Sequence, residues 1–345
     1  MTQDPPHHPP SIWWFAFGYF ACYVPYSALT KAISSGTLPH MDEAVPGFEL
    51  LPITTVASMF GMLSFLWLSG WWRAASRQQI FGASLPLPGR WTFLSGLCTA
   101  AIIGTTTLAY TFEGASIVFM MLLMRGGVLV IAPIVDTLSK RRVRWFSWVA
   151  LGLSLSALLT ALLGEGHFGL TLVAAVDVLI YLMSYFIRLR FMSRLAKSSD
   201  VSATKRYFVE EQMTAAPAIV LTLIVLALLA SVFPGSAQLQ QVRAGFGSFF
   251  DRGLTGYGLV IGLLSQGTGI FGGLILLDGR ENSFCVPVNR ASSVLAGLLA
   301  SLGLYLWLGT RFPSAQELFG AILVISAILF LSVPPLMEKR RARRG

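Results

Sequence analysis

The chain has 345 residues, of which 54% are hydrophobic and only 12% are charged, and its mean hydropathy is +0.68. Soluble domains carry about 25% charged residues, so this composition excludes a protein dissolved in water and predicts a membrane protein. The net charge of +9 would also suit nucleic acid. Its placement, described below, suits a membrane surface instead, and we expect no nucleic-acid partner.

Ten apolar stretches, each long enough to cross a hydrocarbon core with about 20 residues, recur along the chain. They predict an all-α integral membrane protein with ten transmembrane helices. The stretches are residues 12–33, 50–72, 91–111, 114–136, 145–164, 168–190, 207–233, 254–277, 283–308 and 316–337.

The basic residues indicate the orientation of these spans. If the N-terminus is cytoplasmic, the loops after spans 2, 4, 6 and 8 and the C-terminal tail hold 19 of the 25 Lys and Arg residues. These 19 residues include Arg188, Arg190 and Arg194, which we assign to the loop after span 6. The positive-inside rule therefore places both termini in the cytoplasm. The polar, Pro-rich start lacks the basic n-region of a signal peptide, so we expect the first span to be retained.

An even number of spans with both ends inside permits an inverted repeat of five helices and five helices. We divide the chain into a cytoplasmic tail and two repeats, followed by a basic tail. An arginine lies within the fourth span of the first half, at Arg125, and another within the ninth, at Arg290. The boundaries are 1–11, 12–164, 165–337 and 338–345.

The chain has ten short spans, both termini inside, a compact hairpin of spans 3 and 4, a basic residue in span 4 and a closing Gly-rich helix in each half. In these features it resembles the drug/metabolite transporter superfamily. That superfamily includes EamA-type permeases and the nucleotide-sugar and triose-phosphate transporters. The resemblance implies a 5+5 inverted repeat, a central cavity and alternating access for a small polar metabolite. The chain lacks the Lys-Arg or Lys-Thr pair that sugar-phosphate exchangers show in span 9 and has Asn289-Arg290 instead.

A charge at membrane depth is costly and marks a functional site by default. We expect Arg125 and Arg290 to bind an anionic group, since guanidinium binds carboxylate or phosphate through two parallel hydrogen bonds. Arg125 lies deeper and is the stronger expectation. The structural alternative pairs each arginine with a carboxylate or with the carbonyl groups of a helix end. Four tyrosines and a lysine complete the predicted substrate site: Tyr26, Tyr110, Tyr181, Tyr185 and Lys31.

Asp177 lies in the middle of span 6, one helical turn before Tyr181. A carboxyl group in a low dielectric gains affinity for protons, so Asp177 is the expected proton-coupling residue. The alternative is a buried salt bridge to one of the two arginines.

The three cysteines lie in apolar segments, the four histidines form no cluster, and no nucleotide-binding loop is present. We therefore expect no metal, no cofactor and no ATP-driven step.

The sequence thus predicts a secondary transporter of a small polar or anionic organic metabolite in the inner or plasma membrane, acting as a monomer or homodimer. It is not expected to be an enzyme. Two alternatives stay open. One is an integral-membrane enzyme acting on a lipid-linked substrate, although such enzymes usually gather acidic residues and histidines at a membrane face. The other is a non-transporting receptor or assembly protein.

Overall fold

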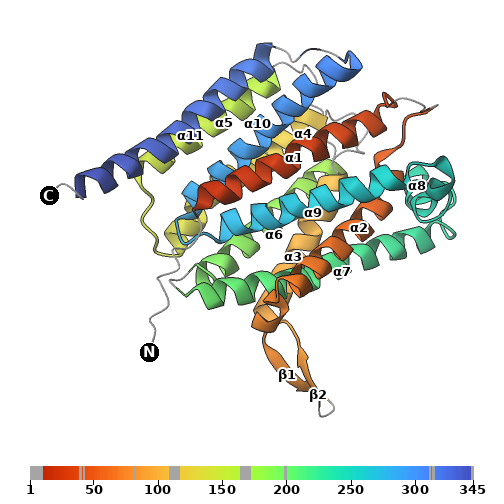
Figure 1. The fold of residues 1–345 in the computed structure, drawn as a ribbon, viewed down its shortest axis with the longest axis horizontal. Coiled ribbons are helices and arrows are strands. Elements are labelled where there is room, and N and C mark those ends of the chain that lie inside the picture. The colour runs from red at the N-terminus through yellow and green to blue at the C-terminus, as the bar shows by residue number, and fades with distance from the viewer. Residues whose placement is uncertain are drawn as a thin grey trace.

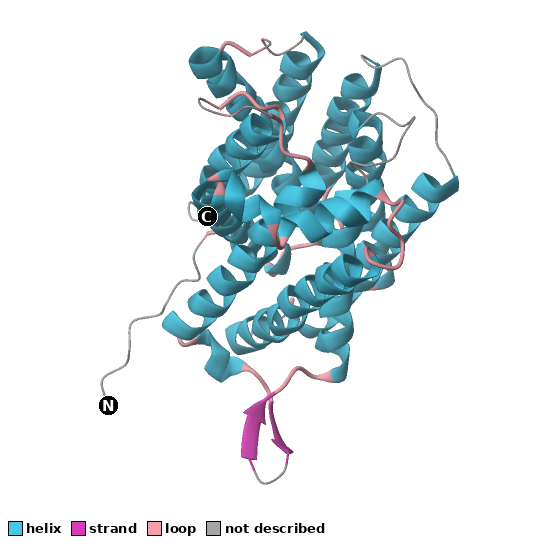
Figure 2. Cartoon of the chain, turned by 90° about the vertical axis from the view of Figure 1, so that its right-hand side faces the viewer, coloured by secondary structure: helices cyan, strands magenta, loops and turns pink. Residues whose placement is uncertain are grey.

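The computed structural model describes residues 11–38, 41, 43–80, 83–108, 117–163, 172–197, 200–310, 312 and 315–342. These residues form an all-helical bundle with one small hairpin (Figures 1 and 2). The α-helices are α1 (Ile12–Ser34), α2 (Gly47–Leu68), α3 (Arg90–Leu108), α4 (Ile117–Leu138), α5 (Trp145–Leu163), α6 (Leu172–Leu195), α7 (Val201–Leu229), α8 (Ala237–Gly245), α9 (Thr255–Leu277), α10 (Asn282–Leu308) and α11 (Ala315–Ala342).

Ten of these helices overlap the ten apolar stretches, and α8 is the addition. Within the described part of the chain, four helices are long and apolar enough to cross a membrane, namely α2, α7, α9 and α10. This is the pattern of a multi-pass membrane protein, as the composition predicted.

Local chemistry explains several helix boundaries. The hydroxyl of Ser11 caps α1 by accepting a hydrogen bond from the amide of Trp13, and the carboxylate of Asp200 caps α7 by accepting from Ser202. After α2 the backbone of Gly70 adopts φ 68°, which a residue without Cβ reaches easily and which ends the helix. The second span therefore ends earlier than predicted, and a 3₁₀ helix, Trp71–Ala74, follows it.

The loop between α2 and α3 contains an antiparallel hairpin. Strand β1 (Arg77–Ile80) pairs with β2 (Ala83–Pro86), and Arg77 lies opposite Pro86. The hairpin projects from the lower edge of the bundle in Figure 1. Helix α8 and the 3₁₀ helix Ser248–Arg252 lie at the right-hand side of the bundle.

The helices are stacked in an ordered series across the bundle. Helices α5 and α11 pack together at one edge, followed by α4 and α10, then α6 and α1, then α3 and α9, and finally α7 and α2 (Figure 1). The largest buried apolar cluster extends through this series, from α11 to α7, and includes Tyr19, Val128, Tyr181 and Val288.

Close helix approach in the bundle relies on glycine. A Cβ on Gly262 of α9 would lie 2.4 Å from the carbonyl oxygen of Thr54 in α2. A Cβ on Gly267 would lie 2.6 Å from the sulfur of Cys22 in α1. Gly262 and Gly267 therefore serve helix packing, as small residues do in membrane helices.

Candidate functional site

Two arginines and four tyrosines meet in the middle layers of the bundle, where α1, α4, α6 and α10 pack against one another. We call this group the arginine–tyrosine cluster. Its members are Arg125 of α4, Arg290 of α10, Tyr19 and Tyr23 of α1, and Tyr181 and Tyr185 of α6.

The first half of the cluster is built around Arg125. Its Nη2 donates a hydrogen bond of 3.2 Å to the hydroxyl of Tyr23. The ring of Tyr23 is stacked on that of Tyr19, with centroids 5.4 Å apart. The ring of Tyr26 packs edge-on against Tyr23, with centroids 5.6 Å apart. Tyr23 therefore links Arg125 to the aromatic side chains of α1, a role that the sequence did not assign to it.

The second half is built around Arg290. Its guanidinium carbon lies 5.1 Å from the centroid of the Tyr185 ring, a cation–π geometry. Its Nη2 lies 3.5 Å from the hydroxyl of Tyr181, whose ring is 4.9 Å from that of Tyr185. The Nε atom of Arg290 is buried without a hydrogen-bond partner. Arg290 therefore retains donor capacity, and its side chain is aligned by two aromatic residues one turn apart on α6.

The two halves of the cluster form one electrostatic unit. Both Arg125 and Arg290 interact electrostatically with Tyr19 and with Tyr181. Two guanidinium groups that act on the same two phenols share one region of the bundle. Such a region favours an anion, because positive charge acts over longer range where water is excluded.

The structure brings together Arg125, Arg290, Tyr181 and Tyr185 from the predicted site. Tyr26 borders them through Tyr23. Lys31 does not join them: it lies exposed in the last turn of α1. Tyr110 lies outside the described residues.

Asp177 is buried on the inner face of α6, one turn before Tyr181, and only 5% exposed. Its Oδ2 atom has no hydrogen-bond partner. Among the described residues it forms no ion pair, and it shows no electrostatic interaction with Arg125 or Arg290. The alternative in which Asp177 forms a salt bridge to one of these arginines is therefore wrong.

A buried ion pair that the sequence interpretation missed adjoins the cluster. Arg188 of α6 donates from Nε and Nη2 to the two carboxylate oxygens of Glu211 in α7, at 2.9 and 2.8 Å. Ser95 of α3 donates to the same carboxylate at 2.7 Å and contacts the hydroxyl of Tyr207 at 2.6 Å. The side chains of Arg188 and Glu211 are 7% and 0% exposed.

The count of cytoplasmic loop charges therefore needs a correction, because Arg188 is a core residue and not a loop residue. One feature of the sequence could have revealed this ion pair. Glu211 is an acidic residue inside an apolar span, and such a residue by default has a charged partner or a function. Arg188 also acts electrostatically on Tyr185, so the ion pair and the arginine–tyrosine cluster are neighbours.

No group of three or more His, Cys, Asp or Glu side chains that could hold a metal ion occurs in the described part of the chain.

No family model and no curated protein matches the sequence. One solved structure that the chain matches is described only as "Crystal structure of protein". It is 18% identical with a TM-score of 0.53, and the match covers 95% of this chain and 98% of that chain. At this identity the likeness shows a shared fold alone. Because it covers nearly the whole of both chains, the fold is shared across the entire bundle.

Proposed function

We propose that the chain is a secondary transporter of a small polar or anionic organic metabolite, of the kind found in the drug/metabolite transporter superfamily. It would have ten membrane spans in two inverted repeats and both termini in the cytoplasm. The observation that carries this proposal is the arginine–tyrosine cluster. Two arginines meet there in the middle of an apolar helical bundle, where a charge is retained at a considerable energetic cost.

The pairing of the helices supports the repeat. If α1 to α5 correspond to α6, α7, α9, α10 and α11, most large contacts have a counterpart in the other half. Helix α1 packs against α9 and α10, and α6 packs against α3 and α4. Helix α2 packs against α9, and α7 packs against α3. The pairs α4–α10 and α5–α11 are then contacts between corresponding helices.

The cluster itself follows the same duplication. In the proposed repeat, Tyr19 and Tyr23 on α1 correspond to Tyr181 and Tyr185 on α6. In each pair the two tyrosines lie four residues apart on the first helix of their half. Each half thus supplies two tyrosines one turn apart and one arginine on its fourth helix. A site assembled from two related halves is the usual arrangement of transporters built from inverted repeats.

Two buried glutamates add independent support. Glu49 lies nineteen residues before Leu68, the end of α2, and Glu210 lies nineteen residues before Leu229, the end of α7. Glu49 binds Arg252, which lies three residues before the start of α9. Glu210 accepts hydrogen bonds from the amide of Gly89 and the hydroxyl of Thr92, at the start of α3. In the proposed repeat, these two carboxylates would anchor corresponding helix starts.

In this proposal the anionic group of the substrate binds to the guanidinium groups, and Arg290 contributes its unpartnered Nε. Tyrosine hydroxyls supply further donors, and the ring faces contact the carbon skeleton. Asp177 is the proposed proton-coupling residue, since its buried Oδ2 makes no hydrogen bond. Transport would then alternate between exposure of the cluster to either side of the membrane.

The test begins with a thermal-shift panel of the purified full chain against inorganic phosphate, sugar phosphates and dicarboxylates, because a ligand of the folded state raises the melting temperature. The anion that stabilises is then assayed for uptake into proteoliposomes. We expect Arg290→Gln and Arg125→Gln to lose at least tenfold in uptake. Arg142→Gln, at an exposed arginine, serves as the matched control. Full uptake by both cluster variants, or no stabilisation by any anion, would reject the proposal.

A further inference from the structure

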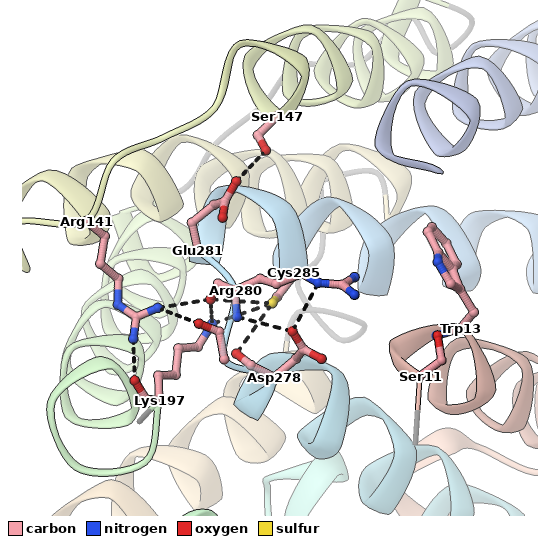
Figure 3. Close-up of polar contacts among 10 residues, drawn as sticks. Ser11, Trp13, Arg141, Ser147, Lys197, Asp278, Arg280, Glu281 and Cys285 are labelled. Carbon is pink, nitrogen blue, oxygen red and sulfur yellow. Dashed lines mark hydrogen bonds and ion pairs between the residues drawn. The ribbon is translucent and has the colours of Figure 1, made fainter. Parts of the chain in front are cut away.

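The short turn between α9 and α10 is held by basic side chains from two other turns (Figure 3). Arg141, which follows α4, donates from Nη1 to the carbonyl oxygens of Gly279 and Arg280 at 3.0 and 3.1 Å. Its Nη2 donates to the carbonyl oxygen of Lys197, which follows α6. The Nζ of Lys197 in turn donates to the carbonyl oxygen of Arg280 at 3.0 Å. One guanidinium therefore joins three turns at one end of the bundle.

A buried carboxylate from α4 binds the start of α10. Asp136, which is 0% exposed, accepts from the amide and the side chain of Asn282 at 2.9 and 2.8 Å. Its other oxygen accepts from the amide and hydroxyl of Ser283, both at 2.7 Å. The N-cap residue of α10, Glu281, makes no capping bond and instead accepts from Ser147. Asp136 thus takes the place of the missing cap and opposes the positive end of the helix dipole.

The same residue fixes Arg141. The backbone of Lys140 adopts φ 56°, and the amide of Arg141 donates to the carbonyl oxygen of Asp136. This is the hydrogen bond of a Schellman turn, which closes a helix C-terminus. The end of α4 therefore presents Asp136 and Arg141 together to the α9–α10 turn. We call Asp136, Arg141 and Lys197, with residues 278–283, the α9–α10 latch.

The latch acts on the helix that carries Arg290. Arg290 lies eight residues after Asn282, about 12 Å along the helix axis. The latch joins α4 of the first half to α10 of the second. A movement that separates α4 from α10 at this end must therefore break the hydrogen bonds of Asp136 and Arg141.

The carboxylate of the latch has no counterpart on α10. Aligning α4 with α10 on Arg125 and Arg290 pairs Asp136 with Ser301 and pairs Asn282 with Ile117. The position on α10 that corresponds to Asp136 therefore carries a hydroxyl and not a carboxylate.

We propose that the α9–α10 latch is the gate on the side of the membrane that carries this turn, and that Asp136 and Arg141 are its gating residues. This rests on the proposed transport function and on its assignment of this turn to the cytoplasm. The latched structure is closed at this end. Release of α10 from Asp136 opens a path from the cytoplasm to Arg290.

The chain carries its own reporter of this gate. Cys285, in the first turn of α10, is 0% exposed, and its sulfur lies 3.5 Å from the Nζ of Lys197. The full chain, with Cys22 and Cys98 replaced by alanine, is reconstituted and treated with N-ethylmaleimide. Labelling of Cys285 is followed by mass spectrometry. We expect Arg141→Gln and Asp136→Asn to label at least tenfold faster than the parent. The neighbouring Arg142→Gln, whose side chain is exposed, should label at the parental rate.

A second reporter separates gating from general loosening. Cys98, buried on α3 beside Arg188 and Glu211, is kept as the sole thiol in a parallel set. Its labelling should be unchanged by the latch substitutions. Equal labelling of Cys285 in the Arg141→Gln and Arg142→Gln variants would overturn the proposal, and so would acceleration of both reporters together. The labelling assay needs no substrate. Its result can therefore be interpreted even if the uptake experiment fails.

Discussion

Arg188 and Glu211 form a two-bond ion pair in which the carboxylate is completely buried and the guanidinium nearly so. Removing one partner of such a pair leaves an uncompensated charge, which costs about 3–5 kcal/mol. We expect Glu211→Gln to lower the free energy of unfolding by this amount in detergent. The double replacement Arg188→Met with Glu211→Leu should recover most of the loss, because it leaves neither charge in the core.

The matched control for this prediction is the pair of Arg252 and Glu49, which has a similar N–O distance of 2.8 Å. The Arg252 side chain is 35% exposed, so water screens the interaction. Arg252→Gln should therefore cost less than Glu211→Gln, although it leaves the buried Glu49 carboxylate without its partner. Equal losses from Glu211→Gln and Arg252→Gln would show that burial does not determine the strength of these pairs.

Sequence reasoning located the helices well and the long-range polar pairs poorly. The predicted span 254–277 agrees closely with α9, because apolar length and flanking polar residues are local signals. Tyr181 and Tyr185 were placed together because helical periodicity puts them on one face. By contrast, Asp136 was only the last residue of a predicted span. Its partners lie far along the chain and become visible only once α4 and α10 are packed together.

The same contrast explains the remaining differences. Arg188 follows an apolar run and precedes further arginines, so its sequence context resembles a cytoplasmic loop. Its burial depends on Glu211, which belongs to another helix. The hairpin between Arg77 and Pro86 has no strong alternation of apolar and polar residues, which is the signal that predicts a strand.

The contact of α9 with α2 provides a second stability prediction. Gly262→Ala would place a Cβ 2.4 Å from the Thr54 carbonyl oxygen, a backbone atom that cannot move without its helix. We expect a clear fall in melting temperature, corresponding to about 1–3 kcal/mol of overpacking. Gly297→Ala in α10 meets no atom within 4 Å and should leave the melting temperature unchanged or raise it. A harmless Gly262→Ala would contradict the close approach of the two helices.

Lys140 offers a third prediction, because its φ of 56° is a left-handed conformation that favours glycine. Lys140→Gly should preserve or raise the melting temperature. Lys140→Val should lower it, since a β-branched residue is disfavoured most strongly there. Thermal unfolding of the two variants beside the parent measures this difference. A Val variant as stable as the Gly variant would be inconsistent with the Schellman turn at the end of α4.

The fourth prediction concerns how Arg290 is held. Its guanidinium lies against the ring face of Tyr185, and such a contact contributes about 0.5–2 kcal/mol, the larger values applying away from water. Tyr185→Phe keeps the aromatic face and should retain the anion-induced rise in melting temperature. Tyr185→Leu removes the face and leaves a side chain that cannot orient the cation, so the concentration of anion needed for the same rise should increase several-fold. Because both variants lack the hydroxyl, the difference between them reports on the ring alone. An equal loss in both would assign the effect to the hydroxyl and would remove the cation–π contact from the account of this site.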